Sequence, residues 1–253
     1  MSSTRVAIEK YVHRFLQVER FLQDSCLNGL QVEGKGTVRT IATAVTASLF
    51  VIQRAVELGA DALFVHHGLF LRGKEVLVTG IMKEKIATLV KNDLSLFAYH
   101  LPLDAHRFVG NNWAIARKLG MKNLQPFGAH QGEFIGVRGV LPQQARMVLS
   151  HKLEKLYNAP PQVALGGKEK IRTCGIISGN AHKWIHEAID AKLDCFVTGT
   201  HDEPIWHIAH EEGINFLSFG HAATEKIGMQ LLGKHLERKF GVKALFIEEP
   251  NPF

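Results

Sequence analysis

The feature that most constrains this fold is an alternation of short apolar, β-branched runs with longer stretches of helical period. The apolar runs cover residues 41–45, 62–65 and 94–99 in the first half and 172–177, 195–198 and 215–219 in the second. Parallel sheets covered by helices produce this pattern. We therefore predict an α/β fold with mainly parallel sheets.

The second half of the chain resembles a loose copy of the first. At a fixed offset, three residues of the first half meet identical residues of the second: Ile52, Ala55 and Asp61 meet Ile185, Ala188 and Asp194. Both halves also show the same order of helix, acidic turn, buried strand, polar loop, helix, buried strand and polar loop. We predict two related three-layer α/β units, residues 1–127 and 128–253, joined in the glycine-rich stretch 127–142. The C-terminal strand could pack back on the first unit.

Composition narrows the class of protein further. A chain of 253 residues with 46% apolar residues can fill a sizeable core, and a net charge of +6 suits anionic ligands. Nucleic acid is not the expected partner, although the charge leaves it open. Three widely spaced cysteines form neither a disulfide framework nor a zinc knuckle, which indicates a reducing, cytoplasmic location. Charges interrupt the apolar N-terminus and no run of about 18 apolar residues occurs, so we expect no signal peptide and no membrane span.

Residues of metal-ligand type follow the predicted strands. His66 and His67 follow one strand, Asp104 follows another, and His221 with Glu225 follows a third. Open parallel sheets bind ligands beyond the carboxyl ends of their strands. His221 and Glu225 are four residues apart, which places them on one face of the first helical turn. Imidazole with carboxylate suits transition metals better than calcium.

Each of these residues also has a purely structural interpretation. Neighbouring residues of a strand face opposite ways, so the two histidines share one site only if the chain turns, which Gly68 would permit, or if each binds a different metal ion. Asp104 could be a solvated turn residue, and Glu225 could interact with the helix dipole. His100 could orient a ligand or move protons. Ser178 is expected to cap a helix rather than line a cleft.

Several segments together resemble one known family. They are residues 28–34 (NGLQVEG), 65–68 (VHHG), 100–104 (HLPLD) with the asparagine pair 111–112, Thr198-Gly199, residues 220–225 (GHAATE) and residues 250–252 (PNP). In this order the set resembles the YbgI-like family, also called Nif-three-like proteins or GTP cyclohydrolase 1 type 2 homologues. The resemblance covers nearly the whole chain.

The resemblance implies a dinuclear metal site between the two units. By it, the family's ligands correspond to His66, His67, Asp104, His221 and Glu225, with Glu225 bridging two divalent ions of zinc, iron, manganese, nickel or cobalt. It also implies a toroidal homohexamer, a dimer of trimers, and the short form of the family, without an inserted domain. Two positions depart from the family pattern: Thr200 stands where a glutamate is common, and Ala222 follows the ligand histidine.

Two hypotheses about function follow. The first is a metal-dependent hydrolase acting on a nucleotide-like or cyclic amide substrate, with His100 or Glu203 as the candidate proton carrier; the family name implies GTP ring opening. Two carboxylates and three neutral imidazoles leave about +2 at the site, which would attract a small anionic substrate. The alternative is a non-catalytic metal-binding ring assembly that recruits or shelters a protein, DNA or a metal.

Overall fold

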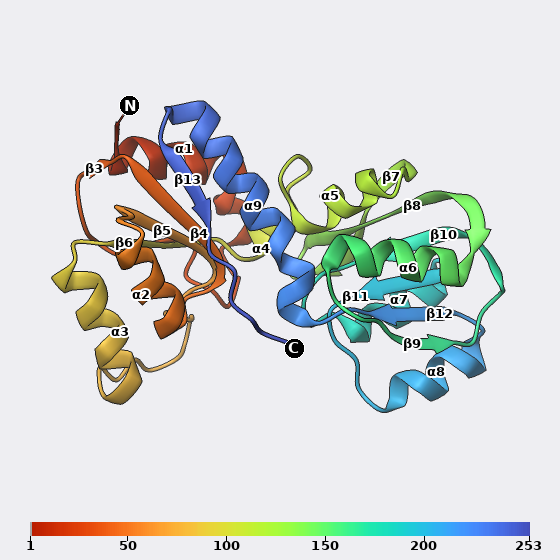
Figure 1. Cartoon of the computed structure of the whole chain (residues 1–253). Coiled ribbons are helices and arrows are strands. Elements are labelled where there is room, and N and C mark those ends of the chain that lie inside the picture. The colour runs from red at the N-terminus through yellow and green to blue at the C-terminus, as the bar shows by residue number, and fades with distance from the viewer. Residues whose placement is uncertain (1) are drawn as a thin grey trace. The chain divides into compact units, whose positions relative to one another are not determined.

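The computed structural model describes residues 2–253 and divides into two compact units. Unit 1 comprises Met1–Leu103 and Gly228–Pro250, and unit 2 comprises Asp104–Ile227 and Asn251–Phe253. Helix α9 (His221–Phe240) begins in unit 2 and ends in unit 1 (Figure 1). Each unit therefore consists of two separate stretches of the chain, whereas the prediction divided the chain only once, after residue 127. Strand β7 (Lys122–His130) runs through that position and pairs with β8 (Glu133–Ala145), so no division falls there.

Unit 1 is built on a five-stranded sheet in the order β13-β4-β5-β6-β2. Its strands are β2 (Gly29–Val32), β4 (Thr40–Thr46), β5 (Ala62–His67), β6 (Ser95–Ala98) and β13 (Lys243–Phe246). Its helices are α1 (Arg5–Leu16), α2 (Leu49–Glu57), α3 (Gly80–Lys91) and α4 (Leu101–Asp104), and a small ladder joins β1 (Ser3–Thr4) to β3 (Thr37–Val38). All neighbours are parallel except β2, which pairs antiparallel with β6.

The middle strand β5 shows why this sheet is buried on both faces. Leu63 and Val65 point to one face and pack in a cluster with Val51 and Ile52 of α2. Phe64 points to the opposite face and stacks on a phenylalanine of β6, with ring centroids 4.5 Å apart. Strands covered on both faces are apolar throughout, and each such side chain contributes about 1.5–3 kcal/mol by leaving water.

Helix ends in unit 1 follow local sequence signals. The Ser48 hydroxyl accepts a hydrogen bond from the Val51 N–H at 3.1 Å and starts α2, and Gly59, at φ 66°, follows its end as predicted. The helical period of residues 6–21 does not form one continuous helix. Gln17 adopts a left-handed conformation at φ 55°, so α1 ends at Leu16 and a 3-10 turn, Val18–Phe21, follows.

Unit 2 is built on a six-stranded sheet in the order β7-β8-β10-β11-β12-β9. Its remaining strands are β9 (Gln162–Leu165), β10 (Lys170–Ile176), β11 (Cys195–Thr198) and β12 (Asn215–Ser218), and its helices are α5 (Asn111–Lys118), α6 (Arg146–Tyr157), α7 (Ile185–Asp190) and α8 (Pro204–Glu212). Strands β10, β11 and β12 are parallel, whereas β7, β8 and β9 join by antiparallel pairing. The sheet is therefore mixed. Among residues 2–253, no helix has both the length and the apolarity that a membrane crossing requires.

The internal repeat expected from the sequence is visible in one matched contact. The Asp61 carboxylate accepts hydrogen bonds from the N–H groups of Arg39 and Thr40, where β4 begins. The Asp194 carboxylate accepts the same bonds from Arg172 and Thr173 in β10. Burial opposes ionisation of both acids, but these N–H groups outweigh it and hold the pKa of each carboxyl below its ordinary value.

Candidate metal centre

Unit 1 gathers three imidazoles at the carboxyl end of its sheet. The possible ligand atoms of His66, His67 and His100 all lie within 4.8 Å of one another. The ring centroids are 4.9 Å apart for His66 and His67, 4.9 Å for His66 and His100, and 5.6 Å for His67 and His100. His66 is fully buried, whereas His67 and His100 are partly exposed. The two adjacent histidines therefore do share one location.

They converge because neighbouring strands hold them from different sides at the end of β5. The Nδ1 atom of His66 donates to the Tyr99 carbonyl oxygen, which follows β6, at 3.0 Å. The Nδ1 atom of His67 lies 3.1 Å from the Thr46 hydroxyl, which ends β4. Gly68 is required for space rather than for a turn, because a Cβ there would collide with the Gln31 side-chain amide. Gln31 accepts hydrogen bonds from two backbone N–H groups of the next loop.

His100 is held by a buried acid, Asp24, that no sequence pattern singles out. Its Nδ1 atom lies 2.8 Å from Oδ1 of Asp24, a residue that is 1% exposed. Asp24 also accepts bonds from the N–H groups of Cys26 and Leu101 and from the Asn28 side-chain amide. Burial would raise the pKa of the Asp24 carboxyl, but His100 and the other donors outweigh burial and lower it. Asp24 is therefore ionised at neutral pH.

In unit 2, the first turns of α9 supply an imidazole and a buried carboxylate. The Nε2 atom of His221 lies 3.2 Å from Oε1 of Glu225, as their four-residue spacing predicts. The Glu225 side chain is 3% exposed and that of His221 is 36% exposed. Removing a carboxylate from water costs several kcal/mol unless positive charge accompanies it.

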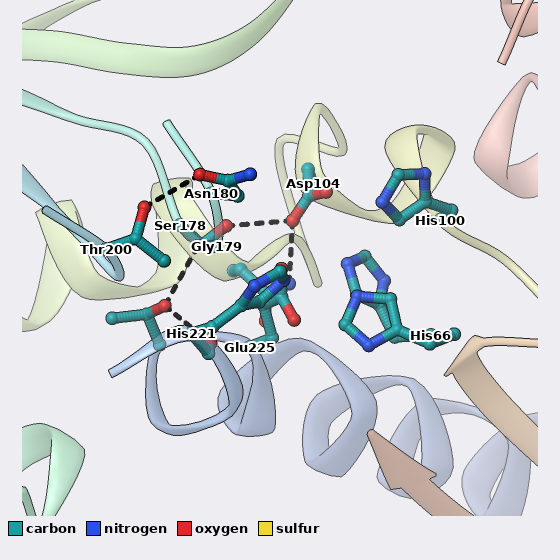
Figure 2. A network of polar contacts seen from close by, with 12 residues as sticks. His66, His100, Asp104, Ser178, Gly179, Asn180, Thr200, His221 and Glu225 are labelled. Carbon is teal, nitrogen blue, oxygen red and sulfur yellow. Dashed lines mark hydrogen bonds and ion pairs between the residues drawn. The ribbon is translucent and has the colours of Figure 1, made fainter. Parts of the chain in front are cut away.

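Asp104 is the second buried carboxylate of unit 2, at 6% exposure. Its Oδ1 atom accepts hydrogen bonds from the Asn111 amide at 2.8 Å and from the Ser178 hydroxyl at 2.9 Å (Figure 2). Asp104 is therefore not a solvated turn residue. The expectation that Ser178 caps a helix was wrong, because its hydroxyl donates to Asp104 and the following 3-10 turn, His182–Trp184, has no side-chain cap.

Two glycines of unit 2 leave the room that α9 needs. A Cβ on Gly179 would collide with the Glu225 carboxylate, and this residue also has a left-handed φ of 68°. A Cβ on Gly199 would lie 2.7 Å from the Thr224 hydroxyl and 2.9 Å from the His221 Cα. Thr224 in turn accepts a hydrogen bond from the Gly179 N–H at 3.0 Å. The predicted Thr-Gly motif after β11 therefore serves close approach by the helix.

Glu203, the other candidate proton carrier, lies at the start of α8. Its side chain is 82% exposed and lies 3.3 Å from the His207 ring. It borders a cavity of about 260 Å³ whose other walls include Trp206 and Phe216. None of the His, Cys, Asp and Glu groups found able to hold a metal among residues 2–253 includes Glu203.

The described residues thus contain buried imidazole and carboxylate groups that are able to hold a metal ion. Neutral imidazole nitrogen and carboxylate oxygen are ligands that zinc and the neighbouring transition metals accept. Sequence reasoning found the histidines and acids from their positions after strands. It missed Asp24, which lies four residues before the NGLQ segment and carries no signal of its own, and it undervalued Ser178 and Gly179, whose only signal was their place at the end of a predicted strand.

Comparison with known proteins points to one family. Residues 3–252 match the family described as Duf34/NIF3 (NGG1p interacting factor 3). A Chlamydia muridarum protein named "GTP cyclohydrolase 1 type 2 homolog" is 45% identical over 228 residues, 89% of this chain and 90% of that protein. A Pseudomonas aeruginosa protein of the same name is 42% identical over 241 residues, 94% of each chain.

Solved structures agree with the sequence comparison. The structure of protein ybgI, described as of unknown function, superimposes with a TM-score of 0.92 at 34% identity and covers 99% of this chain and 100% of that one. TTHA1606 from Thermus thermophilus gives a TM-score of 0.91 at 36% identity, with 99% and 100% covered. The chain therefore belongs to the Duf34/NIF3 family.

Proposed function

We propose that this protein binds two divalent metal ions through His66, His67, Asp104, His221 and Glu225 and uses them to hydrolyse an anionic substrate. The observation that carries the proposal is the burial of two carboxylates, Asp104 at 6% and Glu225 at 2% exposure. Charges this deeply buried are costly unless cations accompany them.

The residues of the chain would hold and orient the ligand atoms. Ser178 and Asn111 fix one oxygen of Asp104, and the absent side chain at Gly179 leaves space for Glu225. Tyr99 and Thr46 fix the two adjacent imidazoles through their Nδ1 atoms. When bound, divalent ions would lower the pKa of a water molecule and polarise the bond to be cleaved. Fixed ligands need little rearrangement when the ions bind.

We propose a nucleotide-like or cyclic amide substrate. The support is chemical and comparative: five ligands with two carboxylates leave about +2 at the site, which favours an anion. The relatives named "GTP cyclohydrolase 1 type 2 homolog" suggest a nucleotide. His100 and Glu203 are the candidate proton carriers, and Glu203 is sufficiently exposed to exchange protons with water.

Metal analysis and turnover test this proposal together. Protein purified without chelator should contain two divalent ions per chain and should hydrolyse at least one member of a panel of nucleotides, cyclic amides and phosphoesters. His67→Ala and Glu225→Ala should each reduce turnover at least about 100-fold, because the loss of a ligand alters the charge and the geometry of the site. His151→Ala, which changes an exposed histidine of α6, is the matched control.

Two results would overturn the hydrolase. Turnover that survives both ligand substitutions would show that the catalysis has another origin. Metal-replete protein that turns over no member of the panel would favour the alternative, a ring that binds metal and recruits or shelters a partner.

We propose that the chain assembles into a homohexamer. Three neighbouring apolar residues are exposed near the start of α3: Leu77 at 71%, Val78 at 52% and Ile81 at 58%. Exposed apolar segments of this kind often mark interaction surfaces. Light scattering should give six times the chain mass of 28.2 kDa, and a monomer mass at micromolar concentration would overturn the proposal.

A further inference from the structure

Unit 2 contains a cavity of about 260 Å³ that the proposed metal centre does not use. It lies where the first turn of α8 passes over β9 and β12, the two neighbouring strands at one edge of the six-stranded sheet (Figure 1). The residues that line it include none of the five proposed metal ligands. Sites for drug-sized ligands have about 300–1,000 Å³, so this cavity suits a single ring system.

The floor of the cavity is apolar and is fixed by the sheet. Phe216 of β12 is 1% exposed and pairs in register with Ala164 of β9, and both border the cavity. Leu217, the next residue, packs in the core cluster on the opposite face of the sheet, as the alternation of a strand requires. Ile205 of α8, 4% exposed, adds a further apolar wall. These walls are therefore formed before any ligand binds.

Trp206 of α8 is an exposed aromatic ring held in place at the edge of this cavity. A Cβ on Gly166 would collide with the Ala209 carbonyl oxygen, so α8 packs backbone to backbone against the chain that follows β9. The His210 ring lies 4.2 Å from the Trp206 ring between centroids, and its Nδ1 atom donates to the Trp206 carbonyl oxygen at 2.7 Å. Trp206 remains 55% exposed and borders the cavity, so its indole has surface available to a ligand.

The polar residues of the cavity lie on its exposed side and are mainly hydrogen-bond acceptors. They are Gln162, His201, Asp202 and Glu203. The side chains of Asp202 and Glu203 are 46% and 82% exposed, and each lies 3.3 Å from a histidine ring nitrogen. A carboxylate only accepts hydrogen bonds, whereas a glutamine amide both accepts and donates. A ligand that complements this side of the cavity therefore carries N–H donors.

These two properties define one class of ligand. Planar heteroaromatic rings stack on tryptophan and leave water readily for an apolar floor. A ring edge with two adjacent N–H donors matches the two oxygens of one carboxylate, and such paired, charge-assisted bonds are stronger than single neutral ones. The guanine edge has this pair of donors, whereas the adenine edge places a donor beside an acceptor.

We infer that this cavity binds a planar nitrogen heterocycle with adjacent N–H donors, which stacks on Trp206 and donates to the Glu203 carboxylate. The inference rests on the proposed function only in that the substrate is nucleotide-like. Gly199 lies against the first turn of α9, and Glu203 follows it by four residues, so their Cα atoms are at most ~14 Å apart. A nucleoside phosphate is long enough to place its ring here and its phosphate near His221 and Glu225.

The test uses a ligand without phosphate and protein without metal, so that only the ring is recognised. Chelator-treated full-length protein is titrated with guanosine by calorimetry. Trp206→Ala should weaken binding at least about tenfold, because stacking is lost, and Trp206→Phe should restore most of it. Glu203→Gln should weaken guanosine binding about tenfold, because a charged acceptor is lost. 1-Methylguanosine, which lacks one of the two donors, should bind wild type at least about tenfold more weakly than guanosine and should be nearly insensitive to Glu203→Gln.

Matched controls separate loss of the cavity from damage to the fold. Phe108→Ala removes another exposed aromatic ring of unit 2, at 76% exposure, and Glu211→Gln neutralises an exposed acid at the other end of α8. Neither residue lines the cavity, so neither change should alter guanosine affinity by more than about twofold. Circular dichroism and urea midpoints establish that each variant is folded.

The outcomes distinguish this inference from the proposed function. Wild-type protein that does not bind guanosine at millimolar concentration overturns the inference, and so does equal binding by Trp206→Ala and Glu203→Gln or equal affinity for 1-methylguanosine. Any of these results in a protein that still holds two ions and turns over a substrate leaves the hydrolase standing. Guanosine binding that depends on Trp206 and Glu203, in metal-replete protein without turnover, leaves the inference standing and the hydrolase wrong.

Discussion

The two units share a framework and differ in what they place at its edge. In both, an aspartate accepts hydrogen bonds from two adjacent N–H groups at or near the start of the leading parallel strand, Asp61 for β4 and Asp194 for β10. The next strands, β5 and β11, end differently. Unit 1 places His66 and His67 there, whereas unit 2 places Gly199 and Thr200.

This difference assigns a separate ligand chemistry to each unit. Imidazoles at the end of β5 project from the sheet itself and are held by neighbouring strands. At the end of β11, glycine leaves room for the first turns of α9, so the helix supplies the imidazole and the carboxylate instead. The two units therefore share the same arrangement of strands. The residues at the carboxyl end of each strand determine whether nitrogen or oxygen atoms are the main metal donors of that unit.

The largest effect should come from Gly179 in unit 2. Gly179→Ala should lower the free energy of unfolding by about 2–4 kcal/mol, because the new Cβ collides with the Glu225 carboxylate and φ is 68°. Metal affinity should also fall at least about tenfold, since the collision displaces a ligand. Urea unfolding and metal titration measure the two effects.

Gly213→Ala is the matched control, because Gly213 has the same φ of 68° and open space around its Cα. It should cost only the backbone strain of about 1–2 kcal/mol and leave metal affinity unchanged. If both variants lose metal affinity equally, the positive φ of Gly179, rather than the space needed by Glu225, is the reason why a glycine is required there.

Gly68 offers the corresponding test in unit 1. Gly68→Ala should destabilise the protein by about 1–3 kcal/mol, because the added Cβ meets the Gln31 amide and the Ala98 side chain while φ is ordinary. Gly36→Ala, with no atom within 4 Å of the new Cβ, should stay within about 0.5 kcal/mol of wild type. An unchanged urea midpoint for Gly68→Ala would show that the loop after the two histidines moves to accommodate the new Cβ at little cost in stability.

The shared framework predicts equal, intermediate effects for its two aspartates. Asp61→Asn and Asp194→Asn should each cost about 1–2 kcal/mol at pH 7, because the amide replaces a charged acceptor of two backbone N–H bonds. Each carboxyl has a lowered pKa in the folded state. Its contribution is therefore complete above the unfolded value of about 3.9 and is lost as pH falls below it.

Urea unfolding at pH 7 and at pH 3 measures the contribution of each aspartate to the free energy of unfolding. The difference between wild type and each variant should shrink at pH 3, by a similar amount for both aspartates. A large difference for only one of them would break the equivalence of the two repeats.

The smallest effect concerns His235, a histidine in the part of α9 that belongs to unit 1. The Nε2 atom of His235 lies within hydrogen-bond distance of the Tyr11 hydroxyl, at 2.6 Å, and burial, with Arg238 and Lys239, lowers the pKa of His235. Its neutral form is favoured on folding, so its contribution is present above about pH 6.5 and is lost as pH falls through the folded pKa. Tyr11→Phe should cost below about 1 kcal/mol at pH 8 and less at pH 5 by urea unfolding. A larger cost at pH 5 would contradict this sign.

The sequence was a good guide wherever a signal was local. Strand β11 lies at the predicted residues 195–198, and α2 begins after Ser48 and ends before Gly59 as its caps predict. The segment 29–32 lies in a glycine-containing stretch whose composition is typical of a turn, yet it forms β2. That strand exists because it pairs with β6 at the edge of the sheet, a contact that local composition does not encode.

By itself, the sequence determined the α/β class, the repeat and the positions of the metal-type residues after strands, because period, caps and strand ends are properties of neighbouring residues. Only the tertiary structure decided which polar residues hold those side chains. Asp24 reaches His100 across 76 residues, and Ser178 reaches Asp104 across 74. Such partners are brought together by the packing of strands and helices into a sheet edge, and no local pattern in the chain marks them in advance.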